Sequence, residues 1–97
     1  MRIRVREEAL ADLRAGFRFY ESQAEGLGGY FLDSLYSDID SLLIYAGIHR
    51  VVFGKFYRLL SHRFPFAVYY QIKSDTVFVH AVLDCRQSLE QVAGRLV

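Results

Sequence analysis

The chain has 97 residues, of which 53% are hydrophobic, with 12 basic and 11 acidic side chains. This length predicts a single domain, residues 1–97, whose apolar content is sufficient for a core without metal or disulfide support. The one cysteine, Cys85, excludes an intrachain disulfide, and the net charge of +1 does not by itself indicate a nucleic-acid or membrane partner. Neither a signal peptide nor a membrane-spanning run is visible, so we expect a cytoplasmic protein.

Charge is divided unevenly along the chain. Residues 1–46 carry five basic and eight acidic side chains, a balance of −3, whereas residues 47–97 carry seven basic and three acidic, a balance of +4. Ten of the twelve basic residues are arginine, whose planar guanidinium suits phosphate and carboxylate groups. The second half is therefore the candidate surface for an anionic contact, although an arginine-rich composition is also common in GC-rich genomes.

The first half predicts a short strand followed by a helix. Residues 1–6 alternate apolar and arginine side chains, which is the period of a strand that turns its arginines toward solvent or a partner. Residues 7–24 carry apolar side chains three and four positions apart, which predicts an amphipathic helix. Gly16 interrupts this helix, and we interpret it as a point where two helices approach closely.

A glycine-rich segment and a second helix follow. Residues 26–29 predict a tight turn, because they lack the glycine spacing and the Lys-Ser/Thr pair of a phosphate-binding loop. Residues 30–46 predict a helix whose apolar stripe includes Leu43. Asp38 and Asp40 point in different directions on a helix, so we expect a solvated face rather than a metal site or a carboxylate pair. The two helices should form an antiparallel hairpin.

Beta structure dominates the second half. Residues 47–55 are predicted to be a connection, with a short extended piece at residues 51–53. We expect one strand at residues 56–64, with Pro65 at its end or in a bulge, and a second strand at residues 66–72.

A third strand and a terminal helix complete the chain. Residues 73–76 predict a polar hairpin turn, and residues 77–83 are apolar at nearly every position, which indicates a central strand buried on both faces. Residues 89–96 predict a short helix with Ser88 as its N-cap. The expected fold class is α+β with the order β-α-α-β-β-β, in which the N-terminal strand and the helical hairpin pack on a small, mainly antiparallel sheet, followed by a short C-terminal helix.

A set of short motifs in fixed order runs along almost the whole chain. The motifs are Ala9-Leu10-Ala11-Asp12-Leu13, Phe19-Tyr20-Glu21, Gly26-Leu27-Gly28, Phe31-Leu32, Tyr57-Arg58-x-Leu60-x-x-Arg63-Phe64-Pro65-Phe66-Ala67-Val68-Tyr69-Tyr70, Ala81-Val82 and Arg86. Each motif is weak alone, but the ordered set resembles the RelE/ParE superfamily of type II toxins. Within it, the sequence is most similar to the ParE-like plasmid stabilisation group.

The resemblance implies a toxin whose growth inhibition is neutralised by a small cognate antitoxin. In the family, the antitoxin wraps its C-terminal segment across the sheet and helices of the toxin. The resemblance leaves open whether the complex is a toxin–antitoxin heterotetramer. Members poison either DNA gyrase or translation, the latter by cutting mRNA on the ribosome without a metal or other cofactor. In the nuclease members, basic side chains stabilise the transition state as the RNA 2′-hydroxyl attacks its own phosphate, with general acid–base help.

Three arginines are the candidate target-binding residues. Arg58 and Arg63 flank the first long strand and Arg86 follows the last one, and strand ends of one sheet can meet at one anion. Strict alternation places Arg58 and Arg63 on opposite faces, so convergence requires a bulge or a strand end near Arg63. The alternative for each arginine is an ion pair with a helix carboxylate.

The catalytic set that a nuclease needs is incomplete in this sequence. The weak candidates are Arg58, His62, Arg63 and Arg86. Nuclease members generally carry a histidine or tyrosine near the C-terminus, whereas here no tyrosine follows Tyr70 and Asp84 stands where relatives often have histidine. His62 is a candidate proton carrier beside Arg63, but no acid–base partner for it is visible in the sequence.

The remaining reactive side chains favour structural roles. If the strand alternates strictly, His80 shares a face with Phe78 and Val82, which predicts a packed histidine. Cys85 lies next to Arg86, and a neighbouring guanidinium can lower the pKa of a thiol. A catalytic cysteine also needs a positioned histidine, which Cys85 lacks. No Cys/His cluster has the spacing of a zinc site, so we expect no metal.

The sequence therefore favours a ParE-like toxin that acts by binding DNA gyrase. Two alternatives stay open: a ribosome-dependent mRNA endoribonuclease of the RelE kind, and a degenerate member that acts only through protein interaction. Whether the chain is an enzyme depends on which of the three is correct.

Overall fold

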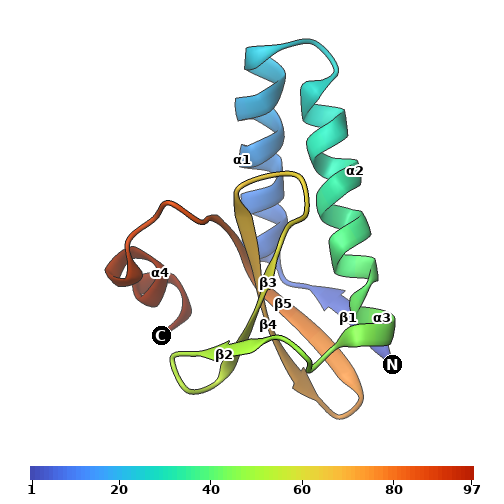
Figure 1. Ribbon diagram of the computed structural model, residues 1–97, viewed down its shortest axis with the longest axis vertical. Helices are drawn as coiled ribbons and strands as arrows, with labels where there is room; N and C mark the ends of the chain where they lie inside the picture. The colour runs from blue at the N-terminus through green and yellow to red at the C-terminus, as the bar shows by residue number, and fades with distance from the viewer.

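A five-stranded sheet with a helical hairpin on one face organises the computed structural model, which describes residues 1–97 (Figure 1). In chain order the elements are β1 (Arg2–Val5), α1 (Glu7–Gln23), α2 (Leu27–Asp40), α3 (Leu42–Tyr45), β2 (Arg50–Val52), β3 (Phe56–Leu60), β4 (Phe66–Lys73), β5 (Thr76–Asp84) and α4 (Leu89–Leu96). The strand order is β1-β5-β4-β3-β2, with β1 parallel to β5 and the other neighbours antiparallel. The expected α+β class is confirmed.

The strands differ from expectation mainly at β2 and β3. The short extended piece is a strand, β2, that pairs with β3 and forms one edge of the sheet. β3 ends at Leu60, earlier than predicted, because Pro65 has no N–H to donate and the chain turns between Ser61 and Phe66. The Ser61 N–H closes this turn by donating to the Phe66 carbonyl at 2.9 Å. Arg63 therefore lies in a loop rather than on a strand.

The second helix begins earlier and ends earlier than predicted. Gly26 adopts φ +86°, and α2 starts at the next residue, so only the first glycine of residues 26–29 belongs to the turn. α2 and α3 are separated at Ser41, whose hydroxyl donates to the Asp38 carbonyl at 2.6 Å and competes with the helical ladder. Leu43 of α3 is 53% exposed instead of joining the buried stripe.

Gly16 lies where α1 and α2 touch, as the sequence predicted. A Cβ atom built on Gly16 meets the ring of Phe31, which is fully buried, at 2.4 Å. A Cβ on Gly28 meets the Phe17 carbonyl oxygen at 2.8 Å. The two helices are close because each presents a glycine to an aromatic residue of the other.

Gly16→Ala is expected to destabilise the fold by about 2 kcal/mol. The added methyl group clashes with the Phe31 ring, and the cost of this clash exceeds the gain in helix propensity from glycine to alanine. The matched control is Gly94→Ala in α4, where a Cβ meets nothing within 4 Å. The control should be neutral or stabilising by up to about 1 kcal/mol. Urea unfolding of both variants checks this, and equal midpoints would contradict the close approach.

The sheet is buried on both faces. Twelve residues form the larger core between the sheet and the helical hairpin: Ala9, Leu13, Phe31, Leu35, Ile39, Leu42, Leu59, Val68, Tyr70, Val77, Val79 and Val82. A smaller core on the opposite face joins the sheet to α4: Ala67, Tyr69, Ala81, Leu83 and Val92. β5 contributes to both cores, which confirms that it is a central strand. α4 begins with a capping box in which Ser88 and Gln91 bond each other's backbone N–H, confirming Ser88 as the N-cap.

A bulge in β5 changes the position of His80. Tyr69 pairs with Ala81 and Tyr70 pairs with Val79, so His80 is an extra residue between them. His80 packs against the Phe56 ring at a centroid distance of 5.3 Å, which confirms a packed histidine. The expectation that it shares a face with Val82 is wrong, because the bulge breaks the alternation and Val82 joins the core under the helices.

Candidate functional site

The structure places Arg58 on the sheet face opposite the helical hairpin. Its Nε donates to the Tyr69 hydroxyl at 3.2 Å. The two side chains line a pocket with Arg50 of β2 and Val92 of α4. Neither Arg58 nor Arg50 forms an ion pair, so this pocket presents two guanidinium groups beside apolar atoms.

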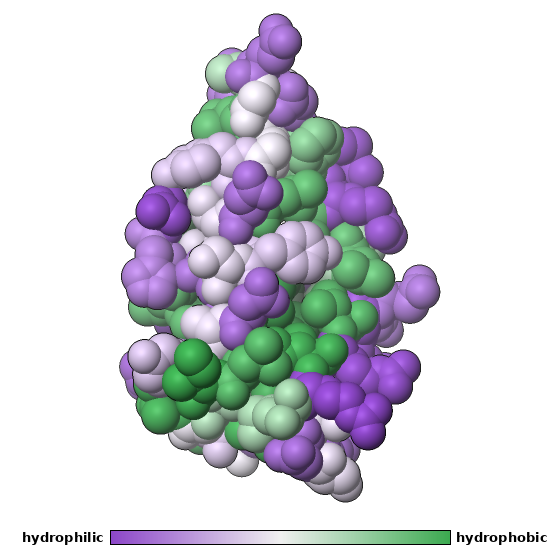
Figure 2. All heavy atoms as spheres, turned by 90° about the vertical axis from the view of Figure 1, so that its right-hand side faces the viewer, coloured by the Kyte–Doolittle hydropathy of each residue, from purple (hydrophilic) through white to green (hydrophobic).

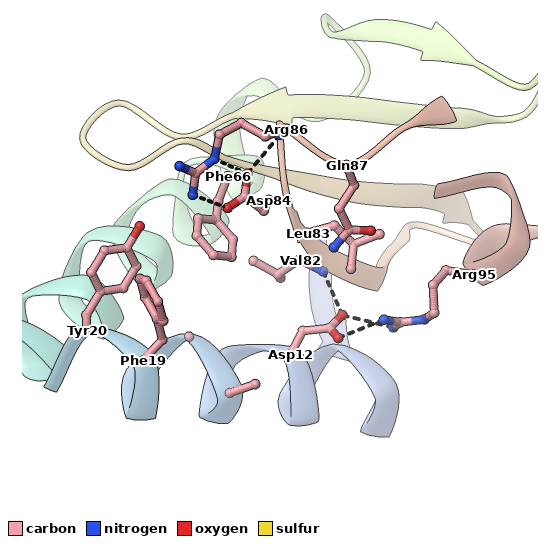
Figure 3. A pocket seen from close by; sticks show the side chains of 12 residues that line it. Asp12, Phe19, Tyr20, Phe66, Val82, Leu83, Asp84, Arg86, Gln87 and Arg95 are labelled. Atoms are coloured by element: carbon pink, nitrogen blue, oxygen red, sulfur yellow. Dashed lines mark hydrogen bonds and ion pairs between the residues drawn. The ribbon is translucent and has the colours of Figure 1, made fainter. Parts of the chain in front are cut away.

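Arg86 follows the C-terminal end of β5 and is held by its neighbour Asp84 (Figure 3). The Arg86 Nε donates to one Asp84 carboxylate oxygen at 2.9 Å, and its terminal nitrogen reaches the other oxygen. These contacts hold the pKa of the Asp84 carboxyl below its usual range. Arg86 therefore pairs with a carboxylate of β5 and not with a helix carboxylate. The ion pair lines a pocket with Phe19 and Tyr20 of α1.

Arg63 occupies a third position, in the loop between β3 and β4. Its guanidinium carbon lies 6.0 Å from the centroid of the Tyr30 ring, and no carboxylate pairs with it. Arg63 thus faces α2, whereas Arg58 lies between the pocket at α4 and a second hollow lined by Tyr45 of α3. The three candidate arginines line three separate pockets and do not meet at one anion.

Cys85 lies between two of these arginines. Burial raises the pKa of its thiol, and this effect outweighs the lowering by the guanidinium groups of Arg58 and Arg86. The expected setting of a lowered pKa is therefore wrong, because the half-buried sulfur loses more from desolvation than it gains from nearby charge. Cys85 is a thiol held in an apolar setting.

His62 has the acid–base partner that the sequence did not reveal. Its Nδ1 lies 2.7 Å from one carboxylate oxygen of Asp38, and the Ser61 hydroxyl donates to the other oxygen at 2.8 Å. The Asp38 side chain is only 6% exposed, whereas that of His62 is 78% exposed. The expectation of a solvated Asp38 is wrong, because the β3–β4 loop covers it and supplies both hydrogen-bond donors; Asp40 is exposed as expected.

The His62–Asp38 pair resembles the orienting half of a catalytic triad in its geometry. A buried carboxylate that accepts from Nδ1–H holds the imidazole in one orientation and leaves Nε2 free on the solvent side. Nε2 is then available to accept a proton or to donate one, beside the Arg63 guanidinium. This is the one acid–base pair that adjoins a candidate arginine, and it lies on the helix side of the molecule.

The spacing of Asp38 within its helix was a usable signal of this pair. Asp38 stands seven residues after Phe31 and three after Leu35, on the stripe that packs against the sheet. A carboxylate on that stripe must find donors, since a buried charge without partners is strongly unfavourable. The residues that supply the donors lie more than twenty positions away, so no local pattern identifies them.

A second histidine ties the α3–β2 connection to the sheet. The buried Tyr70 hydroxyl accepts from the Gly47 N–H at 3.0 Å and contacts His49 Nδ1. Burial lowers the pKa of His49 and raises that of Tyr70. Burial, followed by the nearby cations Arg6 and Lys73, also lowers the pKa of His80. Both histidines are therefore favoured in the neutral form by the fold.

Stability is expected to fall as the pH drops below about 6.5, the ordinary histidine value. Since the folded pKa values of His49 and His80 lie below the unfolded ones, the unfolded chain takes up these protons first. Their contribution is present above this pH and is lost below it. Urea midpoints at pH 7.5 and 5.5 measure the loss, and His80→Gln should reduce it; an unchanged difference in that variant would contradict the assignment.

An exposed apolar surface, the α3 patch, adjoins these side chains. Its members are Leu43, Ile44, Tyr45, Ile48 and Leu60, each at least half exposed. Figure 2 shows hydrophobic atoms gathered in the lower half of the face that carries α2 and α3. A hollow lined by Tyr45, Ile48 and Leu60 also contains Arg58 and His62, so a guanidinium and an imidazole border the patch. An apolar area of this kind marks an interaction surface.

No protein-family model matches the chain, and no curated protein is detectably similar to it in sequence. Among solved structures, the chain matches one chain of the "Chromosomal ParDE TA system from P. aeruginosa" with a TM-score of 0.76. The match covers 84% of this chain and 92% of that chain, at 20% sequence identity. This chain has the fold of that ParDE-system chain. The fold that the sequence resemblance implied is therefore confirmed.

No group of three or more His, Cys, Asp or Glu side chains has the arrangement of a metal site. No helix combines the length and the apolar character that a membrane crossing requires.

Proposed function

We propose that the chain is the toxin of a type II toxin–antitoxin system, of the ParE-like kind, and that a cognate antitoxin neutralises it. The observation that carries the proposal is the fold shared with the ParDE-system chain over most of both chains. The ordered motifs of the sequence, from Ala9-Leu10-Ala11-Asp12-Leu13 to Arg86, support it independently of the fold. The α3 patch supports the presence of a partner protein that covers apolar surface.

We propose DNA gyrase as the target, with Arg58, Arg63 and Arg86 as target-contacting residues. Cleavage of a phosphodiester without a metal relies on charged groups and hydrogen-bond donors aimed together at one phosphate. The three arginines line three separate pockets, and Arg86 is neutralised by Asp84. Cations spread over several surfaces suit contact with a large protein target better than they suit one reacting phosphate.

Ribosome-dependent mRNA cleavage is the second candidate, because of one observation. His62 is oriented by the buried Asp38 and lies beside the unpaired Arg63. A histidine so oriented can take the proton of an RNA 2′-hydroxyl while the guanidinium holds the phosphate. The arrangement provides one acid–base group and one cation, which is fewer than such a reaction ordinarily uses.

The experiment is induction of the chain in growing bacteria, with and without the product of an adjacent short reading frame as antitoxin. We expect growth arrest, loss of normal plasmid supercoiling and a DNA-damage response, all reversed by the antitoxin. Ribosome-phased mRNA cuts without DNA damage would replace gyrase by the second candidate. No arrest at normal expression would leave a degenerate member that acts only through protein interaction.

Arginine substitutions test the proposed contact residues in the same assay. Arg58→Ala, Arg63→Ala and Arg86→Ala should each weaken growth inhibition about tenfold, since each removes a charged contact. The matched control is Arg18→Ala, on the exposed side of α1. His62→Gln should leave toxicity unchanged if gyrase is the target and should abolish it if the histidine is catalytic. Full toxicity in all three arginine variants, with normal folding, would remove these residues from the site.

A further inference from the structure

We propose that the hollow between α2 and the β3–β4 loop is a binding site for a phosphate group. Its lining residues are Ser34, Ser37, Asp38, Ser41, His62 and Arg63, and none is hydrophobic. This hollow, the α2 pocket, lies on the helix side of the sheet and shares Ser41 and His62 with the hollow that Arg58 lines. The proposal concerns ligand binding alone and holds whichever target the chain has.

The Arg63 guanidinium and the His62 imidazole of the α2 pocket are open to a ligand. The Tyr30 ring lies under the Arg63 guanidinium, which forms no ion pair within the protein. Asp38 anchors His62 through Nδ1 and leaves Nε2 on the exposed side. The guanidinium fork of Arg63 matches the oxygens of a tetrahedral oxyanion, and the exposed imidazole of His62 lies beside it.

The single carboxylate of the pocket does not oppose an anion directly. Both oxygens of Asp38 are already occupied, one by His62 and the other by the Ser61 hydroxyl. Asp38 is thus a positioning residue that orients His62. The Arg63 guanidinium has no carboxylate partner and is therefore the group that attracts an anion to the pocket.

A buried hydroxyl supplies the independent sign of a ligand. Ser34 is 4% exposed, and its Oγ has no hydrogen-bond partner in the protein. It is the one buried side-chain polar atom in the chain that is left unpaired, and it belongs to the lining of this pocket. Buried polar groups are almost always paired, so an oxygen atom from outside the protein is expected to accept its hydrogen bond.

The test is a titration of the ¹⁵N-labelled full chain, made by cell-free synthesis to avoid toxicity. Inorganic phosphate, a nucleoside monophosphate and acetate are added in turn at constant ionic strength. We expect saturable shifts at Ser34, His62 and Arg63 with both phosphate ligands and much weaker binding of acetate. Tighter binding of the nucleotide than of inorganic phosphate identifies a nucleic-acid or nucleotide phosphate as the source, and equal binding identifies the free ion.

Variants separate the pocket from general attraction to cations. Arg63→Gln should weaken phosphate binding about tenfold, whereas Arg18→Gln, the same change of charge on α1, should leave it unchanged. Ser34→Ala should weaken binding without lowering the urea midpoint, because the hydroxyl has no partner to lose. Asp38→Asn should alter the imidazole ¹⁵N shifts of His62, which report its tautomer, and should weaken binding as well.

Several results would overturn the proposal. One is NMR shifts that do not saturate or that are spread over all arginines. Another is equal affinity for acetate and phosphate. A third is phosphate binding by Arg63→Gln that is as tight as that by Arg18→Gln. A lower urea midpoint for Ser34→Ala with unchanged phosphate affinity would also overturn the proposal. It would show that the Ser34 hydroxyl hydrogen-bonds to water and contributes to stability but not to phosphate binding.

Discussion

Asp12→Ala is expected to release α4 from the sheet and to lower the free energy of unfolding by about 3 kcal/mol. Asp12 lies on α1 and joins two distant elements through one carboxylate (Figure 3). It accepts the Val82 N–H at 3.0 Å and pairs with both terminal nitrogens of Arg95 at 2.8 and 2.9 Å. Its removal affects β5 and α4 together.

The need for this carboxylate follows from the length of β1. β1 pairs with β5 only as far as Val79, and Arg6 makes the last backbone bond to that residue. Beyond this point the β1 side of β5 has no strand, so the N–H of Val82 requires another acceptor. A buried N–H left without one costs about 1–3 kcal/mol, to which the loss of the Arg95 pair is added.

Hydrogen exchange and urea unfolding check this prediction. The amides of α4 should lose protection in Asp12→Ala, and the urea midpoint should fall. Asp33→Ala is the matched control, since Asp33 is an exposed carboxylate of α2 without an ion pair. Protected α4 amides and an unchanged midpoint in Asp12→Ala would show that α4 is held by the apolar contacts of Val92 alone.

Elements with a local cause were predicted from the sequence. The apolar stripe of residues 7–24, the alternation in β1 and the serine before α4 act through neighbours a few positions away. The contact at Gly16 was predicted for the same reason, because a glycine inside a strong helix pattern needs a packing explanation. These features decide the α+β class and the packing of the hairpin on the sheet.

Features that depend on distant partners were missed. Asp38 was assigned to solvent because its donors, Ser61 and His62, belong to a loop that only the folded sheet brings to α2. The bulge at His80 is a mismatch in length between β4 and β5, which neither strand reveals alone. The separation of the three arginines follows from the early end of β3, which leaves Arg63 in the loop.

Ile44→Glu combined with Ile48→Glu is expected to weaken antitoxin binding at least about a hundredfold, because each apolar side chain is worth about 1.5–3 kcal/mol when buried. The prediction rests on the proposed function. Ile44 and Ile48 are 78% and 73% exposed, so the substitutions should leave the fold intact. In the complex they would place two carboxylates where the α3 patch meets its partner.

The charge around the patch indicates the kind of segment that covers it. Arg58 and His62 line the hollow beside Tyr45 and Leu60, and the second half of the chain carries a balance of +4. An antitoxin segment with apolar residues on one side and acidic residues at its margin complements this surface. New glutamates would therefore lose apolar burial and repel the acidic margin as well.

Affinity measured by calorimetry, together with rescue of growth by co-expressed antitoxin, tests the surface. Val97→Glu is the control, because Val97 is equally apolar, is 76% exposed and lies at the C-terminus, on the opposite side of the molecule from α3 (Figure 1). We expect the control to bind as the unmodified chain does. The double variant should also be more soluble alone, since the exposed apolar area that favours association is smaller. Unchanged affinity in the double variant would place the antitoxin on another face.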